Sequence, residues 1–156
     1  MLDIQKVTTE GPALESIQSL FKAYLGELNE DLCFQSFDSE IDNPLYKYSA
    51  PVGALFIAYY NAIPVGCIAL QPLQEAQTCE MKRLYVIPEH RKLGIGNALV
   101  KALLQEAQSL GYTTMKLDTL ERLQAAIRLY QKFGFETVTA YYDNPLPSVV
   151  YMQKKL

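Results

Sequence analysis

The chain has 156 residues, of which 49% are hydrophobic and 20% are charged, a composition typical of one globular domain with a full-sized core. We therefore expect a single domain over residues 1–156. The formal net charge of −3 argues against nucleic acid as the main partner, because nucleic acid favours a basic face, and it is compatible with a cationic amine substrate.

Targeting signals and metal motifs are not found in the sequence. It has no run of 18 apolar residues, and residues 1–6 lack the basic and apolar regions of a secretory signal, so we expect a cytoplasmic protein with no membrane partner. Cys33, Cys67 and Cys79 have no metal-ligand spacing, and we expect them to be reduced. With His90 as the single histidine, a histidine metal cluster is excluded and no metal is expected.

The first third of the chain predicts one strand and one long helix. Residues 4–7 predict a short strand. Over residues 12–29, apolar side chains recur at three- and four-residue spacing, and Pro12 suits a first helical turn, so this segment predicts an amphipathic helix. The polar and aromatic segment 30–51 predicts a loop with room for one short helix.

Three strands are predicted next. The apolar runs 54–60 and 63–70 are separated by Asn61 and Ala62, a pattern that indicates a hairpin. After a turn, residues 78–86 predict the third strand.

The second half of the chain predicts a crossover unit and a final hairpin. A helix over 97–110 connects the third strand of that group to a strand over 113–117, and such a crossover joins parallel strands in the right-handed sense. A helix over 123–133 precedes an antiparallel pair over 135–140 and 149–153. The predicted fold is α/β, a mixed and mostly antiparallel sheet with one central parallel pair, flanked by helices.

The most informative stretch is Arg91-Lys92-Leu93-Gly94-Ile95-Gly96, which lies between a predicted strand and a predicted helix. Backbone N–H groups at a helix N-terminus can bind a phosphate or pyrophosphate through their orientation and the helix dipole. Gly94 and Gly96 let the backbone approach the anion, and Arg91 adds a permanent charge.

Two better-known phosphate motifs do not fit this turn. A P-loop ends in Gly-Lys-Ser/Thr, but here Gly96 is followed by Asn97 and Ala98. The dinucleotide fingerprint needs Gly or Ala at the position of Leu99, so a dinucleotide-binding domain is excluded.

From Cys79 to Phe135 the chain resembles the GNAT superfamily of acetyl-CoA-dependent N-acetyltransferases. The segment Glu80 to Gly96 resembles the acetyl-CoA motif of that family, and Ala125 to Phe135 resembles its second signature, a helix that ends in L-Y-x-x-x-G-F. The resemblance implies a twisted sheet whose central parallel strands splay apart. It also implies transfer of an acetyl group from acetyl-CoA to a primary amine by direct attack in a ternary complex.

The resemblance implies that acetyl-CoA, as co-substrate, lies in the gap between the two parallel strands. Its pantetheine arm would pair with the backbone of residues 83–86, and its pyrophosphate would bind the amides of residues 93–98. A β-bulge near Leu84 would open the ladder and aim a backbone N–H at the thioester. The expected cofactor-binding residues are Leu84, Tyr85, Val86, Arg91, Lys92, Leu93, Gly94, Ile95, Gly96, Asn97 and Ala98.

Two side chains are candidates for proton transfer. An amine is protonated at pH 7, and Glu80 is the candidate base: it matches a base position of several family members, and its spacing from Leu84 predicts the same strand face. The alternatives for Glu80 are an exposed carboxylate or an ion pair with Lys82 or Arg83, and Lys82 on the same face could keep it ionised. Tyr130 matches the frequent general acid of the family, and core packing is the alternative.

The connection between the last two strands is a candidate acceptor site. In this family it often borders the acceptor, and Tyr141, Tyr142 and Asp143 could bind an amine by cation–π and ionic contacts. An equally good interpretation is a turn at Asp143-Asn144-Pro145 with the tyrosines packed beneath it.

One position departs from the family pattern. Leu123 stands where many members have an asparagine that contacts the cofactor, and Gln124 or Thr119 could supply that contact instead. If Glu80 is not the base, the next candidates are Asp118 and a water held by backbone carbonyls.

The acceptor and the assembly are left open by the sequence. A free amino acid, a polyamine, an aminoglycoside and a peptide N-terminus are all compatible acceptors, and a homodimer is compatible with the resemblance. The alternative function is a non-catalytic acyl-CoA-binding module that acts as a sensor or partner domain.

Overall fold

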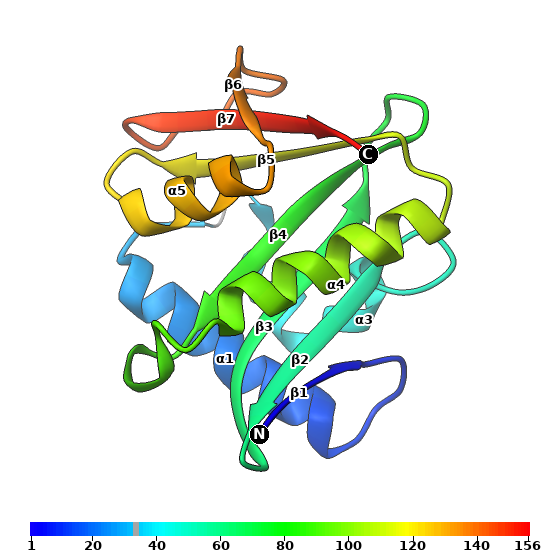
Figure 1. The fold of residues 1–156 in the computed structure, drawn as a ribbon, viewed down its shortest axis with the longest axis vertical. Coiled ribbons are helices and arrows are strands. Elements are labelled where there is room, and N and C mark those ends of the chain that lie inside the picture. The colour runs from blue at the N-terminus through cyan, green and yellow to red at the C-terminus, as the bar shows by residue number, and fades with distance from the viewer. Residues whose placement is uncertain (33–34) are drawn as a thin grey trace.

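The structure is a computed structural model, and it describes residues 1–32 and 35–156. Within those ranges, one twisted sheet contains seven strands in the order β1-β2-β3-β4-β5-β7-β6 (Figure 1). The strands are β1 (Leu2–Lys6), β2 (Ala54–Tyr60), β3 (Ile63–Pro72), β4 (Thr78–Val86), β5 (Thr114–Leu120), β6 (Glu136–Val138) and β7 (Val149–Lys155). The helices are α1 (Pro12–Leu28), α2 (Phe37–Asp42), α3 (Pro44–Lys47), α4 (Ile95–Ser109) and α5 (Gln124–Lys132).

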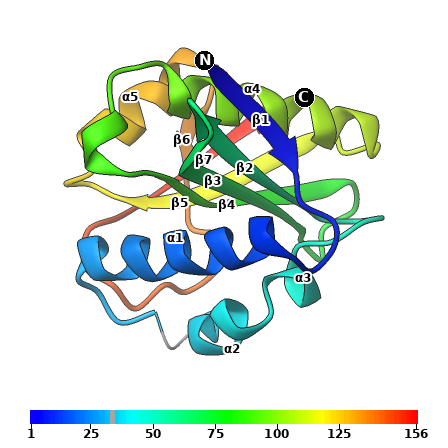
Figure 2. The same cartoon turned by 90° about the horizontal axis from the view of Figure 1, so that it is seen from below.

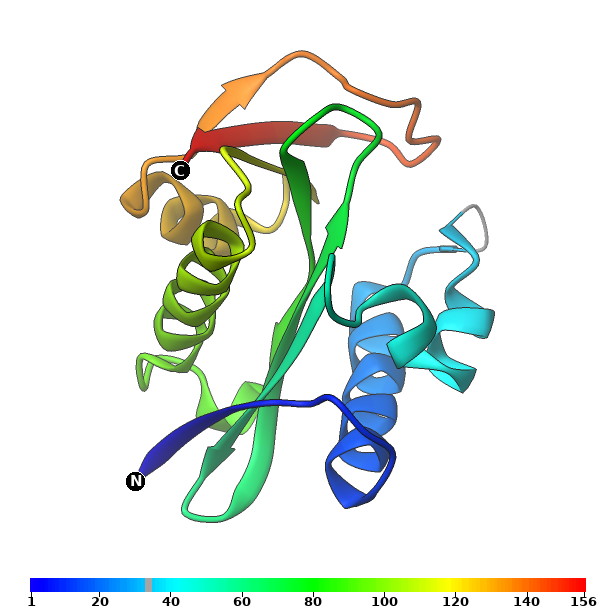
Figure 3. The same cartoon turned by 90° about the vertical axis from the view of Figure 1, so that its right-hand side faces the viewer.

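Helices cover both faces of this sheet. Figures 2 and 3 show α4 and α5 on one face and α1, α2 and α3 on the other. Each layer has its own apolar core, one beneath α4 and one beneath α1. The apolar stripe that predicted α1 is the buried side of that helix, with Leu14, Ile17, Leu20, Phe21 and Leu28.

The central parallel pair separates soon after it forms. β4 pairs with β5 only where Thr78, Cys79 and Glu80 face Thr114, Met115 and Lys116. Both strands continue beyond that point, and Figure 1 shows them diverging. The backbone of β4 after Glu80 therefore has no ladder partner on its β5 side, which confirms the splayed pair.

A β-bulge in β4 lies next to this opening. On β3 the paired positions are Ala69 and then Cys67, whereas the facing positions on β4 are Lys82 and then Tyr85, so β4 contains one extra residue. Arg83 has a φ of 60°, which an L-residue rarely adopts. The bulge that was expected near Leu84 is thus present.

The bulge reverses which side of the sheet the following residues face. Arg83 contacts Glu40 on α2, whereas Leu84 packs with the core beneath α4. Glu80 and Lys82 lie on the α2 side with Arg83. The expectation that Glu80 and Leu84 share a strand face is therefore wrong, because simple alternation does not continue through a bulge.

Several predicted element bounds also differ. α4 begins at Ile95 rather than Asn97, because Gly94 adopts φ 81° and lets the helix start directly after the turn. β5 extends to Leu120 rather than Leu117, because β7 pairs with it along its whole length. In the described part of the segment 30–51, two short α-helices, α2 and α3, stand where one was expected.

Cys67 and Cys79 are free and buried, and Cys33 lies outside the described residues. Among the described residues, no group of three or more His, Cys, Asp or Glu side chains is arranged to hold a metal ion. No helix in the described ranges combines the length and the apolar character needed to span a bilayer.

Candidate active site

A cleft lies where β4 and β5 part. Its walls are the strand residues beyond the paired segment, the ends of α1 and α5, and the connection before β7. The described residues that line it are Tyr24, Leu28, Leu32, Gln35, Met81, Lys82, Arg83, Leu84, Leu117, Asp118, Thr119, Leu120, Leu123, Ala126, Tyr130, Asn144 and Leu146.

A second hollow, which we call the polar hollow, adjoins this cleft. Gln35 and Lys82 line both of them. The described residues of the polar hollow are Gln35, Ser36, Lys47, Gln71, Leu73, Gln74, Glu75, Glu80, Lys82, Lys116, Tyr141 and Tyr142. Two spaces therefore meet at one lysine on the bulged strand.

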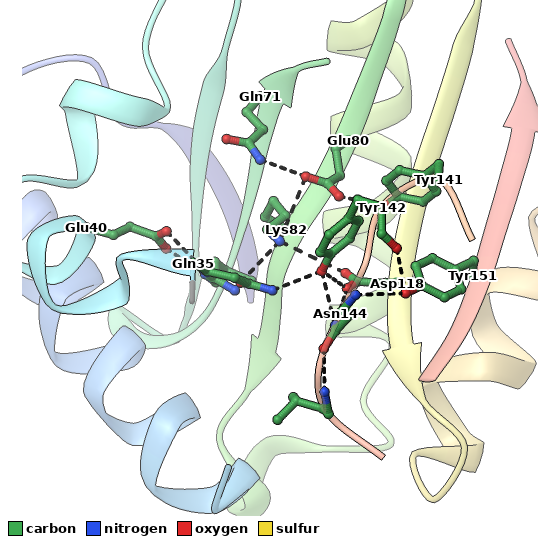
Figure 4. A network of polar contacts seen from close by, with 12 residues as sticks. Gln35, Glu40, Gln71, Glu80, Lys82, Asp118, Tyr141, Tyr142, Asn144 and Tyr151 are labelled. Carbon is green, nitrogen blue, oxygen red and sulfur yellow. Dashed lines mark hydrogen bonds and ion pairs between the residues drawn. The ribbon is translucent and has the colours of Figure 1, made fainter. Parts of the chain in front are cut away.

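Glu80 is buried and lies among polar partners. Its side chain is 4% exposed, so the alternative of an exposed carboxylate is wrong. Gln71 Nε2 and the Tyr141 hydroxyl each donate to one of its oxygens at 2.6 Å, and Lys82 Nζ lies 3.8 Å away (Figure 4). Both carboxylate oxygens of Glu80 therefore have a hydrogen-bond donor, and a lysine lies beside them.

Lys82 connects this carboxylate to a second one. Its Nζ lies 3.8 Å from Glu80 and 4.0 Å from Asp118, and it donates to Gln35 Oε1 at 3.2 Å. Burial lowers the pKa of Lys82 from its ordinary 10.5, although the two carboxylates oppose that change. The prediction that Lys82 shares the face of Glu80 is confirmed.

Asp118 contributes more than the sequence indicated. It accepts hydrogen bonds from the Tyr142 hydroxyl and from Asn144 Nδ2, the latter at 2.7 Å. It lies within β5 rather than after it, and therefore projects from a paired strand. The sequence indicates Asn144 only as part of a turn, and its neighbours in the chain carry no signal that its side chain reaches a carboxylate on β5.

Tyrosines from the connection before β7 cover the site. Tyr141 and Tyr142 point toward Glu80 and Asp118, and their rings lie 5.4 and 5.9 Å from that of Tyr151 (Figure 4). Burial, followed by the nearby carboxylates, raises the pKa of both hydroxyls, so they remain neutral donors. Asp143, which follows Tyr142 in the chain, is exposed.

Tyr130 lines the cleft from α5. It is buried, and its ring lies 5.9 Å from the ring of Phe135, so it also packs in the core. Burial raises the pKa of its hydroxyl well above its ordinary 10.0. The phenol therefore keeps its proton at physiological pH.

The glycine turn leads into α4 as the motif predicted. Gly94 is the N-cap of α4, no side chain caps this end, and the first described backbone bond of the helix runs from Ala98 N to the Gly94 carbonyl. The amides of Ile95, Gly96 and Asn97 precede that bond and lie in the first turn, where N–H groups have no intrahelical partner. Lys92 and Leu93 are exposed beside them.

Arg91 has partners that the motif did not indicate. Its Nε donates to the Val86 carbonyl at 2.8 Å, and its Nη2 contacts Glu27 on α1 at 2.6 Å. Glu27 also accepts from the Tyr85 hydroxyl at 3.1 Å, and the Arg91 guanidinium lies over the Tyr85 ring. The turn is thereby connected to α1.

The position that departs from the family pattern lies at the start of α5. Leu123 is the N-cap residue of that helix and lines the cleft. Gln124 is exposed and donates back to the Glu121 carbonyl, whereas Thr119 lines the cleft. Of the two suggested replacements for the asparagine, only Thr119 borders the space.

A buried ion pair supports the bulge from α2. Arg83 Nε and Nη2 donate to the two carboxylate oxygens of Glu40 at 2.6 and 2.9 Å, and the guanidinium lies 4.1 Å from the centre of the Phe37 ring. Burial by itself would raise the pKa of Glu40, but the hydrogen bonds and charge of Arg83 outweigh it and hold that pKa below its ordinary 4.5.

Comparison with known proteins identifies the family. The model of the acetyltransferase (GNAT) family matches residues 14–135. A Schizosaccharomyces pombe protein described as an uncharacterized N-acetyltransferase is 45% identical over 144 residues, which cover 92% of this chain and 88% of that protein. The chain therefore belongs to the acetyltransferase (GNAT) family, and the expected enzyme class, an acetyl-CoA-dependent acetyltransferase, is confirmed.

Solved structures agree on the fold. An acetyltransferase from Streptococcus agalactiae has a TM-score of 0.81 at 22% identity, covering 99% of this chain and 98% of that one. The PaiA N-acetyltransferase from Thermoplasma acidophilum, solved in complex with coenzyme A, has a TM-score of 0.71 at 19% identity, covering 100% of this chain and 99% of that one. The mixed sheet with its central parallel pair is the fold that these proteins share.

We expect Glu40→Gln to lower the free energy of unfolding by about 3–5 kcal/mol, because it leaves a buried arginine without its counter-charge. Urea denaturation measures this, with Glu106→Gln as the control: its partner Lys6 is 42% exposed, and such pairs contribute about 0–1 kcal/mol. Equal losses in the two variants would contradict a structural role for the buried pair.

The same pair predicts a pH dependence. The pKa of Glu40 is lower in the folded chain than in the unfolded chain, so its stabilising contribution is complete above the ordinary value of 4.5 and is lost as the pH falls through the folded value. Wild-type stability should therefore decrease more steeply below about pH 4.5 than that of Glu40→Gln. Parallel curves for the two proteins would exclude this contribution.

Proposed function

We propose that the protein transfers the acetyl group of acetyl-CoA to a primary amine by direct attack within a ternary complex. The observation that carries this proposal is the opening between β4 and β5 at the bulge, with Tyr130 bordering the cleft and Glu80 bordering the polar hollow beside it. Two substrates that approach from these two spaces would meet beside Lys82.

The cleft suits the cofactor. The unpaired β5 side of β4 offers backbone groups over residues 83–86 to the amides of a pantetheine arm, as an added strand would. The uncapped first turn of α4 offers the amides of Ile95, Gly96 and Asn97 to the pyrophosphate. To bind the same pyrophosphate, Arg91 would have to give up its ion pair with Glu27.

The proposed chemistry needs three proton transfers, two from the nitrogen and one to the thiolate. Glu80, directly or through a water, takes a proton from the ammonium, and the free amine attacks the thioester carbonyl. A backbone N–H beside the bulge stabilises the oxyanion. The attacking nitrogen of the tetrahedral intermediate gives up its second proton to water, collapse forms the neutral amide and breaks the carbon–sulfur bond, and Tyr130 gives its proton to the departing thiolate.

The overall activity is tested by thiol release from acetyl-CoA in the presence of a panel of primary amines. Release of free CoA that depends on an amine supports the proposal. Saturable binding of acetyl-CoA without release on any amine would instead indicate the acyl-CoA-binding module.

Gly96→Val should abolish acetyl-CoA binding and leave the fold intact. A Cβ at this position would lie 3.4 Å from Leu129 Cδ2, an ordinary contact, but the branched side chain would occupy the space next to the first-turn amides. Calorimetric titration measures the affinity. Gly26→Val in α1 is the control, since a Cβ there meets nothing within 4 Å, and unchanged affinity in Gly96→Val would show that the anion binds elsewhere.

Tyr130→Phe should lower kcat by about 10²–10⁴-fold and leave acetyl-CoA affinity nearly unchanged, because it removes only the proton donor. The control is Tyr112→Phe, which removes a hydroxyl that donates to the Val52 carbonyl outside the cleft. An unchanged kcat, under conditions where the chemical step limits the rate, would show that Tyr130 only packs in the core and is not the general acid.

Glu80→Gln should lower turnover at neutral pH and recover part of it as the pH approaches the pKa of the acceptor amine, because the free amine then forms without a base. Acetyl-CoA binding should stay intact. The test measures kcat/KM of Glu80→Gln from pH 6 to 9, with Glu136→Gln at an exposed position as the control. If Glu80→Gln keeps the wild-type kcat/KM throughout that range, Glu80 is not the base, and the role passes to Asp118 or to a bound water.

A further inference from the structure

The polar hollow has a composition that constrains what can bind in it. Leu73 is the one apolar residue among the described residues that line it, and the rest carry amide, hydroxyl or charged groups. A space with these lining groups suits a molecule that carries charged or hydrogen-bonding groups.

The charges of the polar hollow favour an anion as well as an amine. Its described lining has three lysines, Lys47, Lys82 and Lys116, and two carboxylates, Glu75 and Glu80. The Glu75 side chain is 62% exposed, so water screens much of its charge. A polyamine or an aminoglycoside, which brings several positive charges, would therefore meet an excess of lysine.

Lys116 is the cation best placed for this anion. It is the partner of Glu80 in the short paired segment of β4 and β5, so the two side chains start from neighbouring strands about 4.8 Å apart. The Lys116 Nζ lies 5.2 Å from the centre of the Tyr141 ring, and the hydroxyl of that same tyrosine donates to Glu80. A carboxylate and an ammonium thus lie side by side around one tyrosine.

The present partner of Lys116 is readily exchanged. Its Nζ lies 3.0 Å from Glu75, which stands in the exposed turn between β3 and β4. The Glu75 carboxylate is 62% exposed and returns to water when it leaves Lys116, so a substrate carboxylate can replace it at small cost. Lys47, in contrast, shares Glu40 with Arg83 and is held at the rim.

We infer that the acceptor is a free amino acid, which rests on the proposed acetyl transfer: its ammonium binds at Glu80 and its carboxylate binds at Lys116. The amine and carboxylate of an amino acid are joined through one carbon, a separation that suits two side chains from adjacent strands. Lys116 is then the residue that determines specificity for a carboxylate-bearing amine.

The experiment compares acids with their amides. Thiol release from acetyl-CoA is measured with the common amino acids, with the carboxamide of each, and with spermidine and kanamycin. At least one amino acid should have a kcat/KM ten times or more above that of its carboxamide and of both polycations. The carboxamide amine is the less basic of the two, so its larger unprotonated fraction works against this result, and the preference must come from binding.

Variants of Lys116 connect the preference to this residue. Lys116→Met should lower the ratio of kcat/KM for acid over amide about tenfold, mainly through the KM of the amino acid, with acetyl-CoA affinity unchanged. Lys116→Arg keeps the charge and should restore the preference, which a merely structural role would not require. Lys101→Met, an exposed position on α4, is the matched control.

The outcomes separate the inference from the proposed function. Equal use of acid and amide, preference for spermidine or kanamycin, or an unchanged ratio in Lys116→Met overturns the amino acid assignment while acetyl transfer stands. Absence of thiol release with every amine overturns the proposed function and the acceptor assignment with it.

Discussion

One extra residue in β4 determines the arrangement of the site. The bulge at Arg83 ends the regular alternation of side chains, and the strand leaves β5 within three paired positions. An uncommon backbone conformation of this kind persists only where the surroundings stabilise it. Here the surroundings are Glu40 and Phe37 of α2, which hold the Arg83 guanidinium through two hydrogen bonds and a ring face.

The N-terminal third of the chain is thereby part of the site. It supplies Glu40 beneath the bulge, Gln35 beside Lys82 and Glu27 beside the glycine turn. The resemblance covered none of these positions, since it began at Cys79. A segment outside the two motifs recognised in the sequence therefore supports the strand that carries the first motif, and differences in this segment can change the acceptor site without changing the cofactor motif.

The features that were predictable from the sequence are local ones. The hydrophobic periods located α1 and the strands, and the order strand, glycine turn, helix identified the uncapped helix end at Gly94. The short motif L-Y-x-x-x-G-F was enough to select Tyr130, which lines the cleft. These signals depend on residues that are close together in the chain, and patterns over such short distances predict helices, strands and helix ends.

The missed features depend on contacts between distant residues. Strand periodicity places Glu80 and Leu84 on one face because it cannot detect an inserted residue. A glycine would have been a signal for the positive φ of the bulge, but here that φ occurs at Arg83. Glu40 meets Arg83 across 43 positions of sequence, and Asn144 meets Asp118 across 26. The sequence around each of these residues does not indicate its partner, and the two residues of each pair come together only in the folded chain.

The contact between Arg91 and Glu27 has a consequence for ionic strength. An arginine that is free in solution gains a new ion pair when it meets a phosphate, and added salt weakens that gain. Arg91 already has a carboxylate partner on α1, so meeting a pyrophosphate would exchange one ion pair for another. If Arg91 contacts the pyrophosphate, screening would act on both sides of this exchange, and the contribution of the arginine to cofactor affinity would depend only weakly on salt concentration.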